Sequence, residues 1–142
     1  MLTIDERVRE LIIEDSITTF PDECCGFLFG YEDGDQRYIT EAQPVNNAKE
    51  GDKRRRFEIA PFDYLQAERY ALDNDLLLLG IYHSHPNHPA IASETDRLAA
   101  QPYFSYVIIS VQQGKFADLL SWRLNDQQQF DEEKINQHKP VI

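Results

Sequence analysis

Two histidines, a serine and an aspartate stand at spacings that suit a metal site. His83, His85, Ser93 and Asp96 follow the pattern H-x-H-x7-S-x2-D. In an extended strand, residues i and i+2 point to the same side, so both imidazoles can reach one point. Residues three apart share a helix face, so Ser93 and Asp96 can both look toward that point. Two imidazoles, a carboxylate and an open position are typical of catalytic zinc. The pattern therefore predicts His83, His85 and Asp96 as zinc ligands.

An upstream carboxylate, Glu23, is the candidate general base. Zinc lowers the pKa of a water that it binds to about 7. A carboxylate within hydrogen-bond reach can take the proton as the water attacks a carbonyl, and then deliver it to the leaving amine. The hydroxyl of Ser93 is the candidate donor to the oxyanion. These residues together predict a metal-dependent hydrolase in which Glu23 and Ser93 are catalytic.

The first half of the chain must position Glu23. A capping-box pattern at residues 3–6 predicts a helix that ends before Pro21. Residues 27–30 read as a buried strand whose hairpin partner is 37–43. After a polar loop we expect a short strand at 56–59, and Pro61 then suits the first turn of a helix that runs to about residue 73.

The second half must position the metal motif. The apolar run 76–82 predicts a strand covered on both faces, and the histidines begin where it ends. A loop follows, and Ser93 can cap a third helix with Asp96 in its first turn. Residues 106–111 and 117–124 read as a strand hairpin, followed by a polar tail with a further strand near Phe130. This alternation predicts an α/β fold with a mixed β-sheet and flanking helices.

Length and composition limit the function classes. The 142 residues predict one domain, 1–142, with its core at about 4–124 and a polar C-terminal tail. A net charge of −11 argues against nucleic acid as a partner. No run reaches the roughly 18 apolar residues of a membrane span, and no signal-peptide core is present, so we expect a cytoplasmic protein without a membrane partner. Adjacent Cys24 and Cys25 are expected to be reduced.

These motifs resemble the JAMM (MPN+) metalloprotease domain, whose signature is an upstream glutamate followed by H-[ST]-H-P-x6-S-x2-D. The segments around Glu23 (P-x-E-x-C-G-x-L-x-G) and Phe57 (R-F-x-I-x-P) resemble the same family. The resemblance implies a deaminase-like sheet and zinc on His83, His85 and Asp96. It also implies that Glu23 is the general base and that Ser93 donates to the oxyanion. The short, free-standing prokaryotic-type members are the most similar.

The resemblance also implies a substrate class. Family members cleave peptide or isopeptide bonds after the C-terminal Gly-Gly of ubiquitin or ubiquitin-like proteins, and some short members act on sulfur carriers. We therefore expect a zinc metallopeptidase whose partner is a ubiquitin-like or sulfur-carrier protein. The alternative is a non-catalytic module that binds a β-grasp protein. A zinc deaminase and a thermolysin-like protease are excluded, because neither H-x-E with P-C-x-x-C nor H-E-x-x-H occurs. The carrier, the bond type, the native metal and the oligomeric state stay open.

Other residues have weaker indications. The basic run Lys53, Arg54, Arg55 and Arg56 suits either an acidic carrier or a solvated loop. His88 suits either a substrate contact or an exposed loop position. The family resemblance implies that Cys25 is a small buried cysteine of the core. We further expect Trp122 in the core, Cys24 partly exposed, and Asn46 and Asn47 beside a groove for the substrate tail.

Overall fold

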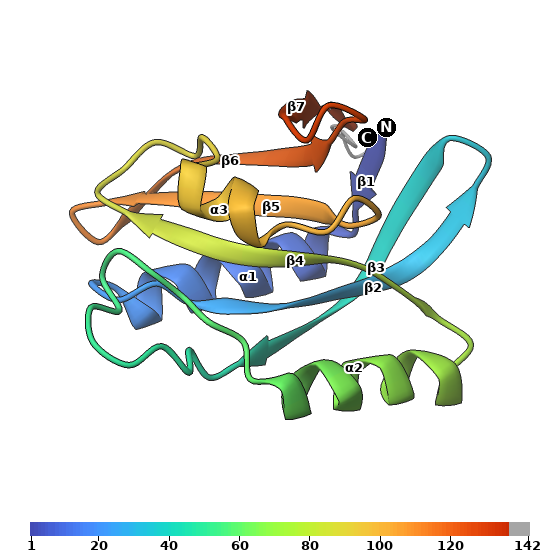
Figure 1. Cartoon of the computed structure of the whole chain (residues 1–142), viewed down its shortest axis with the longest axis horizontal. Helices are drawn as coiled ribbons and strands as arrows, with labels where there is room; N and C mark the ends of the chain where they lie inside the picture. The colour runs from blue at the N-terminus through green and yellow to red at the C-terminus, as the bar shows by residue number, and fades with distance from the viewer. Residues whose placement is uncertain (137–142) are drawn as a thin grey trace, which may run out of the picture.

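A mixed eight-stranded sheet forms the centre of the computed structural model, which describes residues 1–136 (Figure 1). The strands are β1 (Leu2–Ile4), β2 (Cys25–Asp33), β3 (Gln36–Val45), β4 (Leu77–Pro86), β5 (Ser105–Gln112), β6 (Lys115–Leu124), β7 (Phe130–Glu133) and β8 (Ile135–Asn136). The helices are α1 (Glu6–Thr19), α2 (Pro61–Asp73) and α3 (Glu94–Ala99). The strand order is β7-β6-β5-β4-β2-β3-β1-β8. The predicted α/β class with a mixed sheet and flanking helices is confirmed.

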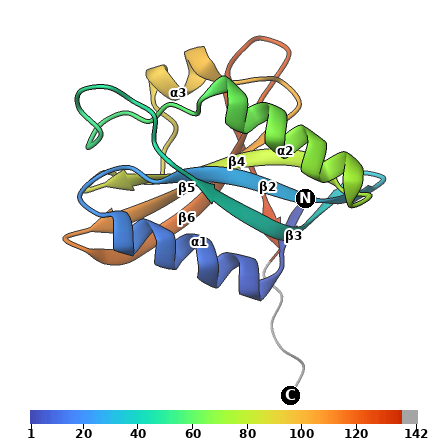
Figure 2. The same cartoon turned by 90° about the horizontal axis from the view of Figure 1, so that it is seen from below.

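The helices lie on both faces of the sheet (Figure 2). α1 covers one face, and α2 and α3 lie over the other. Each face carries its own buried apolar cluster. Val8 and Ile12 of α1 pack with Leu28 and Tyr82, while Ala67 and Ala71 of α2 belong to the cluster that contains Ile81. The sheet thus separates two apolar layers, as expected for alternating strands that are buried on both sides.

Strand β4 presents the histidines to the α2–α3 side. It pairs antiparallel with β2, where His83 faces Cys25, and parallel with β5, where His83 faces Ile108. Tyr82 and Ser84 point to the α1 side, and the Ser84 hydroxyl accepts the backbone N–H of Cys24 at 2.8 Å. The predicted alternation is confirmed. The expected strand end before His83 was wrong, because pairing with β5 continues through Pro86.

Two further local predictions were wrong. Thr3 does not cap the first helix, because it lies in β1, which pairs with β3 and β8. Asp5 is the N-cap, and its carboxylate accepts the N–H of Arg7 at 2.9 Å. Residues 56–59 form no strand, since the backbone of Glu58 bonds to the loop residues Ala48 and Asn47 instead of a neighbouring strand.

The predictions for the later helices and strands are confirmed. The second and third helices, the 105–124 hairpin and a strand at Phe130 are all present. The final six residues of the predicted polar tail lie outside the described residues. Within residues 1–136, the helices are all too short or too polar to cross a lipid bilayer.

A methyl group at Gly80 should disrupt the sheet that holds the histidines. A Cβ atom there would lie 2.0 Å from the backbone oxygen of Ser105, where β4 and β5 pair. We expect Gly80→Ala to lower the free energy of unfolding by about 3 kcal/mol, at the upper end for an overpacked site. Gly34→Ala is the control, because its turn is open and only a positive φ of 59° is strained; we expect about 1 kcal/mol there. Equal denaturation midpoints for the two variants would contradict this account.

Candidate metal and catalytic site

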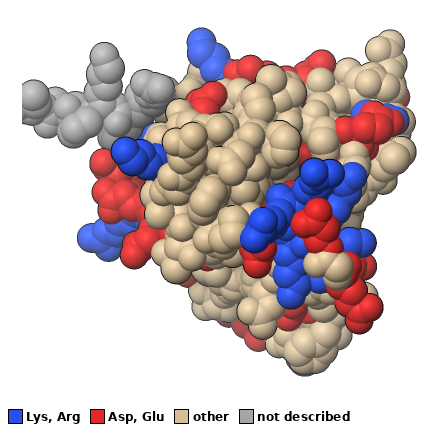
Figure 3. Space-filling model, turned by 90° about the vertical axis from the view of Figure 1, so that its left-hand side faces the viewer, with Lys and Arg blue, Asp and Glu red and all other residues tan. Residues whose placement is uncertain are grey.

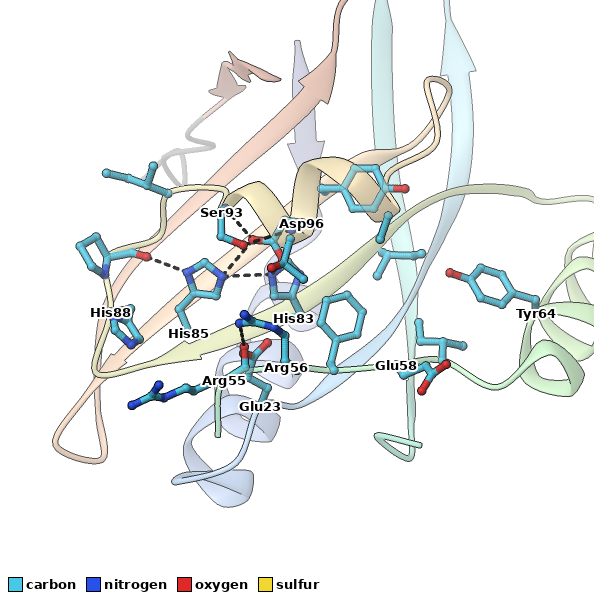
Figure 4. Close-up of a pocket in the computed structure, with 18 residues that line it drawn as sticks. Glu23, Arg55, Arg56, Glu58, Tyr64, His83, His85, His88, Ser93 and Asp96 are labelled. Atoms are coloured by element: carbon cyan, nitrogen blue, oxygen red, sulfur yellow. Dashed lines mark hydrogen bonds and ion pairs between the residues drawn. The ribbon is translucent and has the colours of Figure 1, made fainter. Parts of the chain in front are cut away.

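His83, His85 and Asp96 converge on one point (Figure 4). Nε2 of His83 lies 3.2 Å from Nε2 of His85 and 3.2 Å from Oδ1 of Asp96, and Nε2 of His85 lies 3.2 Å from Oδ2. A tetrahedral zinc site with bonds of about 2.0–2.1 Å has donor–donor edges of about 3.3–3.4 Å. The three donors therefore fit a single zinc-sized ion, as the spacing predicted.

The tautomer of His85 also fits a metal ligand. Its Nδ1 lies 2.8 Å from the backbone oxygen of Pro89, which can only accept, so Nδ1 carries a proton. In the neutral ring, Nε2 is then a lone-pair donor that faces a carboxylate oxygen of Asp96. Two such atoms attract each other only with a cation between them, either a proton or a metal. A backbone carbonyl on the outer nitrogen is typical of metal-bound histidine.

The pKa shifts of His83 and Asp96 favour the protonation states that metal binding requires. Burial lowers the pKa of His83, which favours the neutral ring that a metal requires. Burial opposes the charged form of His85 as well, but its hydrogen bonds with Asp96 and Pro89 raise its pKa. Burial also opposes ionisation of Asp96, yet the charge and hydrogen bonds of the histidines hold its pKa well below the usual range. A carboxylate kept ionised in a buried site is suited to a cation.

His83 is the most deeply buried of the three candidate metal ligands. Only 1% of its surface is exposed, and its ring stacks on Phe57 with 4.4 Å between centroids. Among residues 1–136, its Nδ1 is the one buried side-chain nitrogen or oxygen without a hydrogen-bond partner. The ring is therefore held by packing, and its Nε2 makes the polar contacts of the cluster. Burying an imidazole in this way has a free-energy cost, which a bound cation would offset.

A capping box directs Asp96 toward the histidines. The hydroxyl of Ser93 accepts the N–H of Asp96 at 3.1 Å, and Oδ2 of Asp96 accepts the N–H of Ser93 at 2.8 Å. This arrangement begins α3 and confirms the predicted cap. Because the Ser93 hydroxyl accepts in this contact, its own proton is free to be donated. Ser93 is exposed and lines the pocket beside the histidines.

The loop after β4 is fixed to the neighbouring strands. The indole N–H of Trp122 donates to the backbone oxygen of Ala90 at 2.9 Å, and the Ser110 hydroxyl donates to that of His88. Trp122 packs against the core as expected, but it also holds this loop. His88 has an exposed side chain that lines the pocket. The carbonyl of Pro89 is thereby kept in place for His85.

Glu23 precedes β2 and lies in the same pocket. It is only 4% exposed, its N–H donates to the backbone oxygen of Lys53 at 2.7 Å, and its own carbonyl accepts from Nδ2 of Asn47 at 3.1 Å. Burial raises the pKa of Glu23 to about 8, although the charge of His85 opposes the shift. A raised pKa keeps this carboxyl close to the working range of a general base.

One pocket of about 700 Å³ brings the predicted site residues together. It is lined by all five of them, namely Glu23, His83, His85, Ser93 and Asp96. Apolar side chains form much of the remaining wall, and Arg55 and Arg56 contribute charge. A small number of convergent polar groups in a largely apolar pocket is typical of a ligand site.

Two positioning residues escaped the sequence interpretation. Asn47 was expected only near a groove, but its Nδ2 bonds to the carbonyls of Glu23 and Arg56, and its Oδ1 accepts from Lys49 and Glu58. Trp122 was assigned only to the core. Nothing in the local sequence signals these contacts, which join segments far apart in the chain. The expectation that Cys24 is partly exposed was wrong, since it is 3% exposed and burial raises its pKa to about 12.

Removing the charge of Asp96 should weaken metal binding. Asp96→Asn keeps an oxygen that can complete the helix cap but loses the anionic ligand, so we expect zinc affinity to fall by at least about a hundredfold. Competition against a chromophoric chelator measures the change. Glu94→Gln is the matched control, because Glu94 lies in the same helical turn and pairs with Arg97. Similar zinc affinities for the two variants would show that Asp96 is not a ligand.

The metal-free protein should show the effect of burying Glu23. Its folded pKa of about 8 exceeds the ordinary value of 4.5, so the stability linked to this group is present below about pH 4.5 and is lost as pH rises to about 8. Because glutamine does not ionise, the Tm of Glu23→Gln should gain on that of wild type over this interval. Glu58→Gln, at an exposed pocket position, is the control. A Tm difference for Glu23→Gln that does not change with pH would refute the shift.

Comparison with known proteins gives relatives over most of this chain. It is 38% identical over 94 residues to a protein named desampylase from Haloferax volcanii, an alignment that spans 63% of each chain, less than two thirds of that relative. It is 35% identical over 109 residues to one named CysO-cysteine peptidase from Mycobacterium bovis, covering 75% of this chain and 70% of the relative.

Solved structures and a family profile extend the likeness to the whole fold. A protein from Desulfitobacterium hafniense superposes with a TM-score of 0.85 at 31% identity, covering 99% of this chain and 95% of its own. One from Salinibacter ruber gives 0.73 at 33% identity, covering 99% and 93%. Residues 5–125, which include every site residue described above, match the profile of the prokaryotic homologs of the JAB domain. The chain belongs to this family, the prokaryotic homologs of the JAB (JAMM/MPN) domain.

Proposed function

We propose that this protein is a zinc-dependent peptidase that cuts after the C-terminal Gly-Gly of a ubiquitin-like or sulfur-carrier protein. The main support is that one pocket holds three side chains whose donor atoms could bind a single metal ion, together with a buried carboxyl and an exposed hydroxyl. The relatives named desampylase and CysO-cysteine peptidase support the substrate class. The family resemblance supports the Gly-Gly cleavage point.

His83, His85 and Asp96 would hold the metal. Zinc, when bound, supplies a Lewis acid that makes an attacking water more acidic and polarises the substrate carbonyl. Glu23 takes a proton from that water as it adds to the carbonyl carbon. Glu23 then gives the proton to the amide nitrogen as the C–N bond breaks, so the products are a carboxylate and an amine. Its buried environment keeps the carboxyl able to both accept and release a proton.

Ser93 completes the site on the opposite side from Glu23. Figure 4 shows Ser93 and Asp96 on one side of the two imidazoles and Glu23 on the other. Because the Ser93 hydroxyl already accepts the N–H of Asp96, its proton is available to the developing oxyanion. The helix cap and the oxyanion contact therefore use different parts of one hydroxyl group.

The pocket wall suits a tail without side chains. Phe57, Ile59 and Tyr64 line it together with the three proposed metal ligands. Two glycines can lie in an extended conformation close to such a wall, because they have no side chains that must be accommodated beside the aromatic rings. An extended tail can also bond to polypeptide backbone along its path. This argument favours a Gly-Gly terminus over an ordinary peptide.

A module that only binds a β-grasp protein is the alternative function. Such a module has no need for a buried carboxyl with a pKa near 8, or for a buried imidazole that lacks one hydrogen bond. Both features lower stability. Their placement within one pocket favours catalysis.

Intact-mass spectrometry tests the proposed reaction. Zinc-loaded protein is incubated with ubiquitin-like carriers that carry either one cysteine after Gly-Gly or a lysine conjugate at Gly-Gly. We expect the wild type to release the extension, and Glu23→Gln to keep stoichiometric zinc while its rate falls by at least about a hundredfold. Cleavage by Glu23→Gln at the wild-type rate would remove Glu23 as the base. Intact carriers throughout, with zinc bound, would contradict the peptidase assignment.

A substitution at Ser93 separates its two roles. We expect Ser93→Ala to lower the turnover number by about 10²–10³ at saturating zinc, because an oxyanion donor is lost. Ser93→Thr retains the hydroxyl and should keep most of the activity. If the residue only caps α3, Ser93→Ala will lower stability or zinc affinity and leave turnover at full zinc occupancy unchanged. Steady-state kinetics together with zinc titration distinguish these outcomes.

A further inference from the structure

Arg56 places a positive charge at the active-site pocket, where Glu23 is the neighbouring carboxyl group. The chain has 25 acidic and 14 basic Lys and Arg residues, yet Arg56 forms no ion pair with any carboxylate of residues 1–136. One guanidinium nitrogen donates to the carbonyl of Arg55 at 2.8 Å. Figure 3 shows a cluster of Lys and Arg side chains on one face of the molecule, and the basic residues 53–56 are all exposed. An exposed guanidinium with spare N–H groups is suited to an anion from outside the protein.

One side chain, that of Asn47, joins the backbone of Arg56 to the backbone of Glu23. Nδ2 of Asn47 donates to the carbonyl of Glu23 at 3.1 Å and to the carbonyl of Arg56 at 3.0 Å. Both residues line the same pocket, and Figure 4 shows the guanidinium of Arg56 next to the carboxylate of Glu23, below the imidazoles. The cation therefore sits at the end of the site where the proposed reaction protonates the leaving amine.

The leaving amine brings a particular anion to this place. If one residue follows Gly-Gly, the free α-carboxylate of that residue is two bonds from the amide nitrogen that Glu23 protonates. If Gly-Gly is joined to a lysine side chain, the nitrogen ends a four-carbon chain, and the lysine carboxyl is distant and bound in a peptide. A guanidinium beside Glu23 can thus bind a carboxylate only in the first case, and its planar fork matches that group.

We propose that Arg56 binds the free α-carboxylate of the residue that is released, so that the site prefers a single C-terminal residue after Gly-Gly to a lysine conjugate. This inference rests on the proposed peptidase function and assigns its specificity. Hydrolysis adds water across the C–N bond, leaving the carrier with a Gly-Gly carboxylate and releasing one free amino acid. Arg56 touches the leaving residue and takes no part in the proton transfers.

Binding of a short probe tests this role without relying on turnover. The probe is N-acetyl-Gly-Gly-Ala, as the free acid and as the C-terminal amide, titrated calorimetrically into zinc-loaded Glu23→Gln protein. In this background Arg56 has no catalytic carboxylate to influence. We expect the acid to bind about tenfold to a hundredfold more tightly than the amide, as for one charge-assisted contact. Adding Arg56→Gln should bring the ratio close to one, and adding Arg56→Lys should keep part of it.

A neighbouring arginine supplies the matched control. Arg54 belongs to the same exposed run but does not line the pocket, so Arg54→Gln should leave the acid-to-amide ratio unchanged. A carboxylate can also bind zinc directly, so the dependence of the ratio on Arg56 is the deciding quantity. A ratio near one in the Glu23→Gln protein, absent binding of both probes, or a ratio that survives Arg56→Gln would overturn the inference.

The kinetic counterpart separates this inference from the proposed function. A cleavable carrier is offered with one alanine after Gly-Gly, as acid or amide, and Arg56→Gln should raise the KM of the acid alone by about tenfold or more. If no carrier is cut, the peptidase proposal fails, while the binding ratio still decides the carboxylate site. If Arg56→Gln and Arg54→Gln weaken acid and amide equally, the loop docks an acidic protein surface and the carboxylate role is refuted.

Discussion

Three electron-pair donors that face one another at about hydrogen-bond distance are the constraint on which the site depends. His83, His85 and Asp96 repel one another unless a cation lies between them. Strand pairing and hydrogen bonds hold the three side chains in this arrangement. Strands β2 and β5 flank His83, the carbonyl of Pro89 fixes the tautomer of His85, and a helix cap orients Asp96. A proton can satisfy only part of this cluster, whereas one metal ion can satisfy all three donors.

The pocket around these donors carries further ionisable groups. Glu23 is buried and hard to ionise in the metal-free protein, so folding is less favourable at alkaline pH than an apolar residue would make it. The charge on the pocket wall also differs in sign from the net charge of the protein. The net charge is −11, but Arg55 and Arg56 place positive charge on the pocket wall. Under the proposal for Arg56, a tail that ends in a carboxylate would meet a cation at the site in spite of the acidic surface elsewhere.

Sequence reasoning predicted the parts of the site that depend on short spacings. The alternation in β4 and the three-residue step from Ser93 to Asp96 follow from backbone geometry, so their arrangement could be anticipated. The place of Glu23 depends on the pairing of Cys25 with His83, a contact between distant segments. The residue type and the family motif identified Glu23, but no local pattern located it. Contacts from Asn47 and Trp122 were hidden for the same reason. Thr3 shows the opposite error, because strand pairing of β1 overrode a plausible local capping signal.

X-ray absorption at the zinc edge of the zinc-loaded protein tests the central claim most directly. The account predicts one zinc per chain, with two imidazole nitrogens and oxygen ligands at about 2.0–2.1 Å. Asp96→Asn should lose this spectrum, and Glu23→Gln should keep it. A sulfur shell at about 2.3 Å, as expected if Cys24 or Cys25 bound the metal, or a spectrum without imidazole scattering, would contradict the assignment of His83, His85 and Asp96.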